Sequence, residues 1–357
     1  MKRTIASILC LTFAASMAAC MAACSSNTND TAPADIAGSL IATSSETSNT
    51  TAESTTETTK ETEARGHFEF KPVVVASIFR KIMGEDMCTA YGNFIDAVRS
   101  GKDSFAVKDQ ETYDWMMGQF PGVCYPVVEV STESNYAGAV KDGIGTFQYK
   151  IPKEEFAVKN AEFEKLVTDI LNENLRDDYS DFEKVLALYI YFANNYTYDY
   201  ESYEAMKDHV VDDLSAYRFL TTGHGICSEC APAFSYLLLQ AGVDATCVGG
   251  YDHEWSYVTI NGKNYHVDPT YAMESSVNLS YLMETDQRRE DDDGFKKKDN
   301  IVGNHYGDYK GTEFNADDTF FEPLKGGYLE SWDPEKNIII YRDDDGNMHE
   351  FDYSPFG

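Results

Sequence analysis

The sequence feature that most constrains the fold is a change of hydrophobic period in the second half of the chain. Residues 226–240, ICSECAPAFSYLLLQ, have the apolar pattern of a helix, and Gly242 is a natural stop for it. Residues 245–251 and 253–260 instead show the pattern of strands. A helix that opens with two cysteines and is followed by strands predicts an α+β arrangement in this region.

The strands are expected to continue through Asn261-Gly262, a dipeptide typical of a two-residue type I′ hairpin loop. The register of this hairpin places three pairs opposite one another on one face: Trp255 with Asp268, His253 with Thr270, and Tyr257 with His266. His253 and Asp268 then become diagonal neighbours, roughly 7 to 8 Å apart between backbones and within side-chain reach. An imidazole beside a carboxylate is the pair that an oriented general base requires.

Cys227 lies at the predicted start of the helix, where unpaired amide donors and the helix dipole favour a thiolate. A neighbouring imidazolium would favour the thiolate further. Cys227, His253 and Asp268 therefore offer a nucleophile, a proton carrier and an orienting group for covalent catalysis. This chemistry requires that the helix and the hairpin meet in space.

Other uses of the cysteines remain open. Five cysteines follow residue 24, and this odd number leaves at least one unpaired within the chain: Cys88, Cys124, Cys227, Cys230 and Cys247. Cys230 is expected to be a buried thiol, with a disulfide, for example to Cys247, as a second alternative. The third alternative is that Cys230 is the partner of Cys227 in a redox or metal site. A redox pair normally follows a strand, whereas residues 214–222 indicate helix or loop.

Two other histidines compete with His253 for the role of base. His266 is on the same predicted face, two residues from Asp268, whereas His224 precedes the helix and is expected to be solvated. A zinc site of both cysteines with His253 and His266 has the wrong spacing, because these histidines are thirteen residues apart.

The N-terminus, MKRTIASILCLTFAASMAACMAACSS, predicts a secretory signal, with two basic residues before a short apolar run. Small residues before a cysteine resemble the lipobox at which bacterial lipoproteins are cleaved and acylated. We therefore expect residues 1–24 to be a lipoprotein signal peptide with Cys24 as the lipidated residue and Cys20 as the alternative. An ordinary signal peptide cut nearby is the other interpretation. Residues 25–65, rich in Ser, Thr and Glu, predict a disordered tether.

The net charge disfavours nucleic acid and anionic membrane surfaces as partners. Cleavage before Cys24 removes Lys2 and Arg3 and no acidic residue, and so lowers the net charge from −31 to −33. The acidic runs at 290–294 and 342–347 fail the EF-hand pattern and are expected to be turns. We predict neither a metal site nor a cofactor.

The folded part is expected to comprise three sections: an α+β section of unknown role at 66–150, a core at 151–290 and a β-rich extension at 291–357. In the first section the patterns predict helices near residues 83–98 and 113–117, and strands at 126–131 and 145–151. In the core, they predict a helix over 163–171 and another that opens with the capping box Ser180–Glu183. In the extension, Asp345-Gly346 predicts a hairpin.

Taken together, four motifs resemble the transglutaminase-like core: Gly225–Ala231 (GICSECA), 241–250 (AGVDATCVGG), His253-Glu-Trp255 and 265–270 (YHVDPT). Residues 281–286 also resemble the segment that follows this core in bacterial members, and the similarity covers roughly residues 155–290. The resemblance implies a papain-like fold, with a nucleophile helix packed on an antiparallel sheet. It also implies that Cys227 is the nucleophile, His253 the base and Asp268 the group that orients His253.

Trp255 and Tyr251 are candidate substrate-binding residues, and Trp255 is also expected to pack beside the histidine. The implied function is a lipid-anchored enzyme at the extracellular face of the bacterial cell membrane, which attacks amide bonds through a cysteine thioester. Its expected partners are protein or peptide substrates, including cell-wall peptides, and the membrane through the anchor only. Hydrolysis is expected rather than crosslinking, because the sequence shows no dedicated amine site. The alternative is an inactive binding or assembly lipoprotein of the cell envelope.

Overall fold

A computed structural model describes residues 66–118, 125–134, 140–208, 211, 214–249, 253–273, 276–293, 301–302 and 315–357. Contacts divide the chain into Met1–Ala64 and Arg65–Gly357, and the elements below belong to the second unit. The predicted signal peptide, tether and anchor, with Cys20 and Cys24, lie outside the described residues, as do Cys124 and Tyr251. Among the helices that the structure describes, none has the length and apolar character that crossing a bilayer needs.

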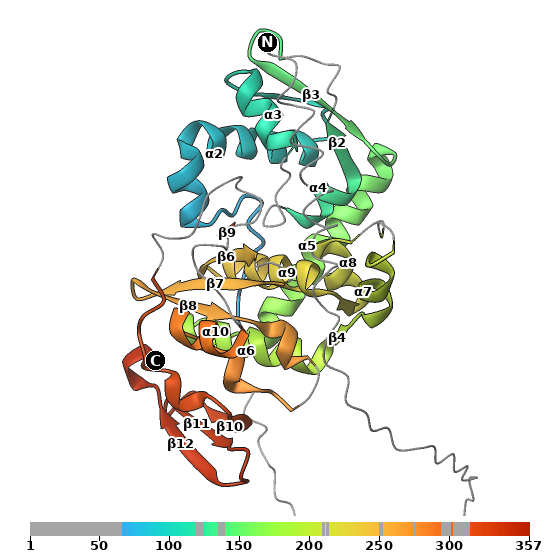
Figure 1. The fold of residues 1–357 in the computed structure, drawn as a ribbon. Helices are drawn as coiled ribbons and strands as arrows, with labels where there is room; N and C mark the ends of the chain where they lie inside the picture. The colour runs from blue at the N-terminus through green and yellow to red at the C-terminus, as the bar shows by residue number, and fades with distance from the viewer. Residues whose placement is uncertain are drawn as a thin grey trace, which may run out of the picture. The chain divides into compact units, whose positions relative to one another are not determined.

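The first section is a mixed α and β unit (Figure 1). Its elements are α2 (Ser77–Arg99), β1 (Ser104–Ala106), α3 (Gln110–Gly118), α4 (Pro126–Ser131), β2 (Thr132–Ser134) and β3 (Ile144–Tyr149). The strands form an antiparallel sheet in the order β1-β3-β2. Both predicted helices are confirmed, as is the strand predicted at 145–151.

The prediction of a strand at 126–131 is wrong, because these residues form the helix α4 (Pro126–Ser131). Pro126 stands at the first helical position, where the N–H group that proline lacks would have no hydrogen-bond partner within the helix. Val127 and Val128 are both buried, and so is Ser131 one turn later. This burial follows a helical rather than an alternating pattern, and a short apolar run does not distinguish the two by sequence alone.

The next elements lead to the cysteine helix. They are α5 (Lys153–Asn174), α6 (Asp181–Asn195), β4 (Thr197–Tyr198), α7 (Tyr200–Met206), α8 (Ala216–Thr222) and β5 (His224–Gly225), which pairs in parallel with β4. The capping box is confirmed: the Ser180 hydroxyl accepts a hydrogen bond from the Glu183 amide, and the Glu183 carboxylate accepts one from the Ser180 amide.

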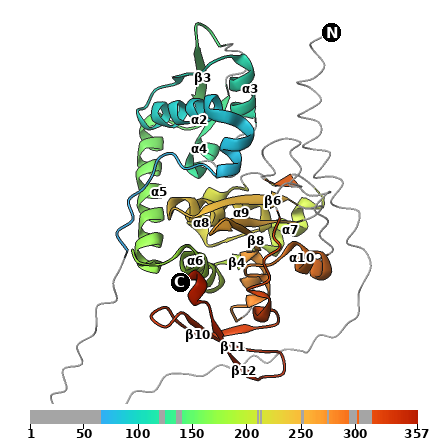
Figure 2. The ribbon, with the colours of Figure 1, turned by 90° about the vertical axis from the view of Figure 1, so that its left-hand side faces the viewer.

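The helix α9 (Cys227–Gln240) packs on a four-stranded antiparallel sheet, which confirms the predicted α+β class (Figures 1 and 2). The sheet has the order β8-β7-β6-β9, formed by β6 (Asp244–Gly249), β7 (Glu254–Ile260), β8 (Lys263–Val267) and β9 (Ile301–Val302). The Ser256 hydroxyl of β7 donates a hydrogen bond to the Ala231 carbonyl of α9.

The hairpin register is confirmed along the whole observed ladder of β7 and β8, from Ile260↔Lys263 to Ser256↔Val267. Asn261 and Gly262 both have positive φ angles, of 52° and 74°, as a type I′ loop requires. The ladder does not extend to the predicted partners of Trp255 and His253, because the chain turns at Asp268 into the 3-10 helix η2 (Pro269–Ala272). The Asp268 amide donates instead to the Tyr281 carbonyl.

The remaining elements cover the other face of the sheet and build a separate small sheet. They are η3 (Leu279–Tyr281), α10 (Asp286–Asp293), η6 (Glu322–Leu324), β10 (Tyr328–Asp333), β11 (Ile338–Arg342), β12 (Met348–Asp352) and η7 (Ser354–Phe356). The strands β10, β11 and β12 are antiparallel in chain order, and the hairpin predicted at Asp345-Gly346 is confirmed.

The turn predicted at 290–294 is wrong for residues 290–293, which complete α10. Arg288 and Arg289 are buried on one side of this helix, whereas Glu290 and Asp291 are exposed. Glu290 and Asp291 therefore lie on the solvent face of a helix whose buried arginines hold it in place.

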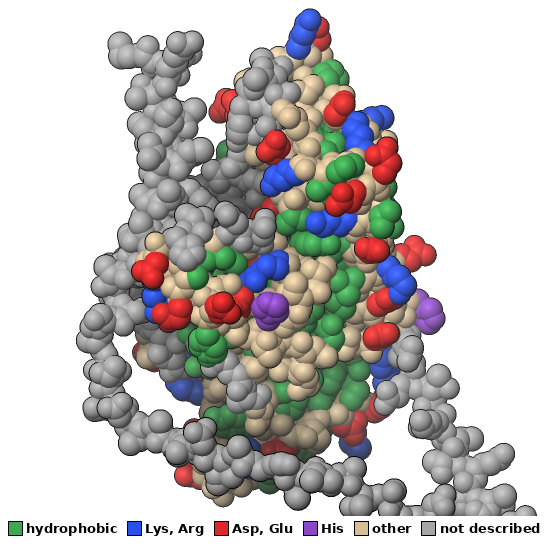
Figure 3. Space-filling view, turned by 90° about the vertical axis from the view of Figure 1, so that its right-hand side faces the viewer, with side chains coloured by type: hydrophobic (Ala, Val, Ile, Leu, Met, Phe, Trp, Pro, Cys, Tyr) green, Lys and Arg blue, Asp and Glu red, His purple; other side chains and the backbone are tan. Residues whose placement is uncertain are grey.

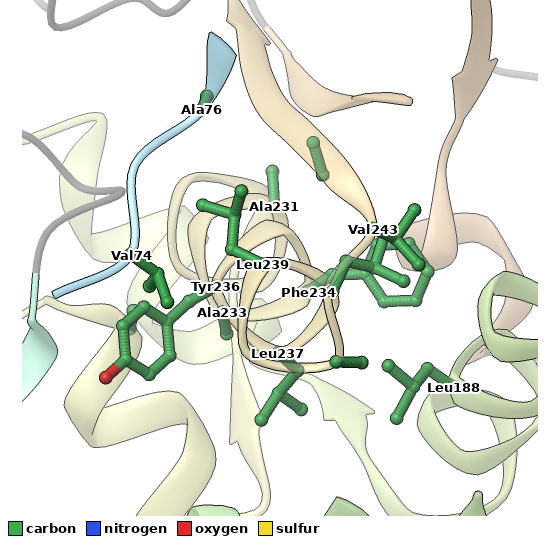
Figure 4. Packing of buried hydrophobic residues seen from close by; sticks show 14 of the residues in the cluster. Val74, Ala76, Leu188, Ala231, Ala233, Phe234, Tyr236, Leu237, Leu239 and Val243 are labelled. Carbon is green, nitrogen blue, oxygen red and sulfur yellow. The ribbon is translucent and has the colours of Figure 1, made fainter. Parts of the chain in front are cut away.

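One continuous hydrophobic core extends from Val74 to Phe356, with α9 inside it. Figure 4 shows Leu188 of α6 on one side of α9 and Val74, from the segment before α2, on another. Polar contacts also join the first section to the core: the Ser77 amide donates to the Asp244 carboxylate of β6 over 2.8 Å. The site is thus built on a helix held from several directions.

Candidate active site

The N-terminus of α9 is held by a buried carboxylate two residues after Cys227. Glu229 is fully buried, and its two oxygens accept hydrogen bonds from the Ile226 amide at 3.1 Å and the Ser215 amide at 2.9 Å. The Arg218 guanidinium of α8 also contacts both oxygens, at 2.8 and 2.5 Å. The sequence analysis missed Glu229, although an acidic residue at the third helical position is a capping signal.

Gly225 has no room for a side chain. A Cβ atom there would lie 2.7 Å from the Glu229 carboxylate and 2.7 Å from the Phe219 ring. The glycine two residues before Cys227 therefore allows Glu229 to reach back over the first turn of α9. This is a physical reason for the Gly-x-Cys spacing in the motif.

The structure brings Cys227, His253 and Asp268 together. His253 Nε2 lies 2.7 Å from Asp268 Oδ2, and the Cys227 side chain lies near enough to the imidazole to raise the pKa of His253. Because Asp268 engages Nε2, Nδ1 is the ring nitrogen that remains for the thiol. Asp268 is fully buried, whereas the His253 side chain is 17% exposed, so the site opens to solvent on the histidine side.

The charges in this set support one another. Burial lowers the pKa of His253, but the negative charges of Asp268 and of a Cys227 thiolate, with hydrogen bonds to both, outweigh burial and raise that pKa to about 10. Burial raises the pKa of Asp268, but the cations of His253 and Arg289 outweigh it and lower that pKa to about 2. The arrangement therefore favours an imidazolium on His253 paired with an ionised Asp268.

The Asp-Pro-Thr motif shapes the carboxylate locally. Asp268 precedes η2, and its Oδ1 accepts the Thr270 amide at 3.2 Å. Pro269 occupies the first position of the 3-10 helix and so ends the strand. The motif thus turns the chain while leaving Oδ2 directed at His253.

Arg289 is a site residue that the sequence analysis missed. Its NH2 group donates to Asp268 Oδ2 over 2.7 Å, so one carboxylate oxygen serves both His253 and Arg289. The only signal in the sequence is that Arg289 follows the segment that resembles bacterial members at 281–286. Nothing local distinguishes this arginine from a solvated one in an acidic run.

His266 and Trp255 form a second polar pair on the face of the sheet opposite α9. The Trp255 Nε1 group donates to His266 Nδ1 over 2.9 Å, and His266 Nε2 lies 3.0 Å from Asp286 Oδ1. His266 is fully buried and both its nitrogens are engaged, so the structure offers His253 rather than His266 to Cys227. His224 has a side chain that is 47% exposed.

Trp255 packs beside His253, with the two ring centres 5.9 Å apart and nearly parallel. Only 3% of Trp255 is exposed, which leaves little of the ring accessible to a ligand. Its predicted contact with substrate stays a prediction, as does that of Tyr251, which lies outside the described residues.

Cys230 is a buried free thiol, and so is Cys247, the partner considered for a disulfide. Burial raises the pKa of both thiols well above its ordinary value. Cys247 Sγ lies 3.8 Å from Ser235 Oγ. Across the described ranges, no group of three or more His, Cys, Asp or Glu side chains is placed to hold a metal ion.

Tyrosines surround the mouth of the site. Tyr271 is 37% exposed, and its ring centre lies 5.1 Å from that of His253. Tyr281 stacks on Tyr271 at 4.4 Å. Burial, followed by the charge of Cys227, raises the pKa of Tyr198, so this ring lies on the cysteine side. The sequence analysis did not single out these tyrosines, which come from three separate elements.

Comparison with known protein families finds one match that includes the candidate site. The sequence profile of the transglutaminase-like superfamily matches residues 168–275, a range that contains Cys227, His253 and Asp268. No curated protein matches the chain.

Three solved structures are similar to part of the chain. A TGase is 21% identical, covers 34% of this chain and 34% of its own, and has a TM-score of 0.28. A candidate cysteine protease from Cytophaga hutchinsonii is 21% identical, with coverage of 34% and 40% and a TM-score of 0.24. A candidate protease from Parabacteroides distasonis is 14% identical, with coverage of 36% and 34% and a TM-score of 0.23. The chain thus spans well under two thirds of each of these proteins.

The predicted resemblance and fold class are confirmed by the family match together with the helix and sheet described above. Residues 168–275 of this chain are a transglutaminase-like domain.

Proposed function

We propose that this chain is a cysteine acyl-transfer enzyme that cleaves amide bonds through a thioester at Cys227. The observation that carries the proposal is the position of His253, which lies 2.7 Å from a buried, ionised Asp268 and close to the Cys227 side chain. This arrangement supplies a thiolate nucleophile and an adjacent proton donor, the two groups that amide cleavage needs.

The chemistry follows from the geometry. The Cys227 thiolate attacks the amide carbonyl, and the His253 imidazolium gives its proton to the departing amine as the C–N bond breaks. Water then attacks the thioester with His253 as base, which releases a carboxylic acid and restores the thiol. The Glu229 and Cys230 amides donate to the Ile226 carbonyl, so the amides of Cys227 and Ser228 at the start of α9 are the candidates to stabilise the charge that the carbonyl oxygen gains.

Hydrolysis is the outcome we favour over crosslinking. The His253 side chain is partly exposed, so water can reach the thioester. The exposed Tyr271 beside His253 offers an aromatic surface for a protein or peptide substrate, including a cell-wall peptide.

We also propose that the enzyme acts at the extracellular face of the bacterial cell membrane, anchored through lipid on Cys24 or, alternatively, Cys20. The signal-like N-terminus and the Ser/Thr-rich residues 25–65 support this location. The net charge of −31 disfavours polyanionic partners such as nucleic acid. On the face shown in Figure 3, acidic and basic side chains are interspersed, as on an ordinary solvated surface.

The test is the rate of iodoacetamide labelling of a residues 66–357 fragment, followed by intact mass between about pH 5 and 9. We expect rapid single labelling well below pH 8, its disappearance in Cys227→Ala, and a rate lower by about a hundredfold in His253→Ala near pH 6. The exposed His224 provides the matched control, and His224→Ala should label like the unmodified fragment. An activated fragment would then be assayed with peptide amides for release of free amine.

Slow labelling with the pH dependence of an ordinary thiol, unchanged by His253→Ala, would contradict the proposal and favour the binding lipoprotein. Loss of rapid labelling in His266→Ala but not in His253→Ala would contradict the choice of base.

A further inference from the structure

Arg289 reaches the site from α10, a helix that begins beyond residue 275, where the family match ends. Its side chain is 1% exposed. Its NH2 group donates to Asp268 Oδ2 over 2.7 Å, and its NH1 group donates to Glu284 Oε2 over 3.0 Å. The centre of the guanidinium lies 4.4 Å from the centre of the Trp255 ring. Two carboxylates and an aromatic face therefore fix the orientation of this cation.

Asp268 needs such a cation because it is fully buried. Its Oδ1 accepts the Thr270 amide, and its Oδ2 accepts from both His253 and Arg289. A buried carboxylate is costly unless it is paired and hydrogen-bonded, and otherwise takes up a proton. During the reaction His253 loses and regains its proton, so its charge is not constant. Arg289 keeps its positive charge throughout.

Other titratable groups lie in this region, and none of them replaces Arg289. Tyr189 of α6, Cys230 of α9 and His253 before β7 interact electrostatically with Asp268. Cys227 lies near His253, Glu284 precedes α10 and contacts Arg289, and Arg288 belongs to α10. Tyr189 and the cysteines are neutral or become negative on ionisation, and Glu284 is itself acidic. Arg288 Nε lies 3.8 Å from Glu284 Oε1, and the Arg288 NH2 group donates to the Ser280 carbonyl. Arg289 is thus the permanent cation in hydrogen-bond contact with Asp268.

We propose that Arg289 is a positioning residue, which keeps Asp268 charged and directs its Oδ2 at His253 throughout the reaction. This inference rests on the proposed function, because it assigns a role to Asp268 in activating Cys227. It also means that the working site extends beyond residues 168–275 to include α10.

The test compares Arg289→Gln and Arg289→Lys in the full-length protein, purified in detergent, with Arg99→Gln as control. Arg99 forms a similar ion pair with Glu164, away from the site. Iodoacetamide labelling of Cys227 is followed by peptide mapping between about pH 2 and 9, a range that includes the pKa of about 2 of Asp268. A neighbouring cation lowers a carboxyl pKa by about 1 to 3 units, so the loss of Arg289 should raise the pKa of Asp268. In Arg289→Gln we therefore expect labelling at low pH to be lost at a pH about one unit or more higher than in the wild type.

Arg289→Lys keeps the positive charge but cannot contact Asp268 and Glu284 at the same time as the guanidinium does. We therefore expect its labelling rate to fall at the same low pH as in the wild type (the acid limb of the profile) and to be several-fold lower overall. Arg99→Gln should leave the profile unchanged. If Arg289→Gln does not fold, the lysine variant decides: an acid limb displaced by about one unit despite the retained charge would overturn the inference.

A folded Arg289→Gln protein with the wild-type profile would also overturn it. A second readout does not depend on catalysis: the pH of acid-induced unfolding should rise in Arg289→Gln by about one unit, because Asp268 then protonates earlier. If wild-type Cys227 is not activated at all, the proposed function fails, and the acid-unfolding shift still decides whether Arg289 holds Asp268 charged.

Discussion

At the scale of single residues, the site is a chain of charges held in a mostly buried place. Asp268 is fully buried, yet its pKa is about 2, because the cations of His253 and Arg289 outweigh the cost of burial. The charge on His253 in turn depends on Asp268 and Cys227. Removing any one of these groups leaves a neighbour buried without its counter-charge. The free-energy cost of an unpaired buried charge is larger than the stabilisation that the ion pair provides.

The pKa of Asp268 makes stability depend on pH. It is lowered from 3.8 to about 2, so its contribution is present above pH 3.8 and is lost as the pH falls through about 2. We expect Asp268→Asn to lower the free energy of unfolding near neutral pH, with about 2 kcal/mol of the loss due to this ionisation. The difference between the two proteins should shrink between about pH 5 and 2 in urea unfolding. A difference that stays constant across this range would contradict the assignment.

At the scale of elements, the position of Cys227 depends on what α9 touches at its first turn and along its length. Glu229 connects this turn to α8 through Arg218. Farther along the helix, Ser235 Oγ lies 3.0 Å from Ser256 Oγ of β7, within the packed interface with the sheet. The nucleophile is therefore carried by a rigid element rather than by a loop, which suits a site that needs a fixed distance to His253.

Gly225→Ala tests this contact between elements. The new methyl group would overlap the Glu229 carboxylate and the Phe219 ring, so we expect a loss of about 1 to 3 kcal/mol in unfolding free energy and slower labelling of Cys227. Gly92→Ala is the matched control, because a Cβ atom there meets nothing within 4 Å inside α2. That variant should be as stable or more stable, by about 1 kcal/mol at most. Wild-type stability and labelling in Gly225→Ala would show that the first turn of α9 tolerates displacement.

At the scale of the whole molecule, the sections predicted at 66–150, 151–290 and 291–357 share one hydrophobic core. The Tyr353 hydroxyl donates to Glu183 Oε1 over 3.0 Å, and the Lys71 amide donates to Gln240 Oε1 over 2.9 Å. Both ends of the described region therefore contact helices of the transglutaminase-like domain. The predicted section boundaries themselves stay a prediction.

A shared core predicts cooperative unfolding of residues 66–357. The three tryptophans, Trp115, Trp255 and Trp332, lie one in each predicted section and serve as local probes. In variants that keep one tryptophan and carry phenylalanine at the other two positions, thermal unfolding followed by fluorescence and by circular dichroism should show one transition with a common midpoint. Distinct midpoints for Trp115 and Trp255 would show instead that the first section unfolds on its own.

The sequence by itself determined the features that depend on near neighbours along the chain. The Asn261-Gly262 turn sets the register of its hairpin, the Ser180 cap starts α6, and the motifs around Cys227, His253 and Asp268 identify the candidate site residues. Turn geometry and capping are energies of adjacent residues, so they can be read from a short segment.

Only the tertiary structure decided which distant groups meet. It made residues 126–131 a helix, turned the chain at Asp268 out of the predicted ladder, and placed Glu229 and Arg289 against the site. Arg289 directly precedes an acidic run predicted to be a turn, and only the packing of α10 against β8 buries it beside Asp268. A buried charge takes as partner whatever group the packed core brings within reach, and that choice is made across the fold rather than along the chain.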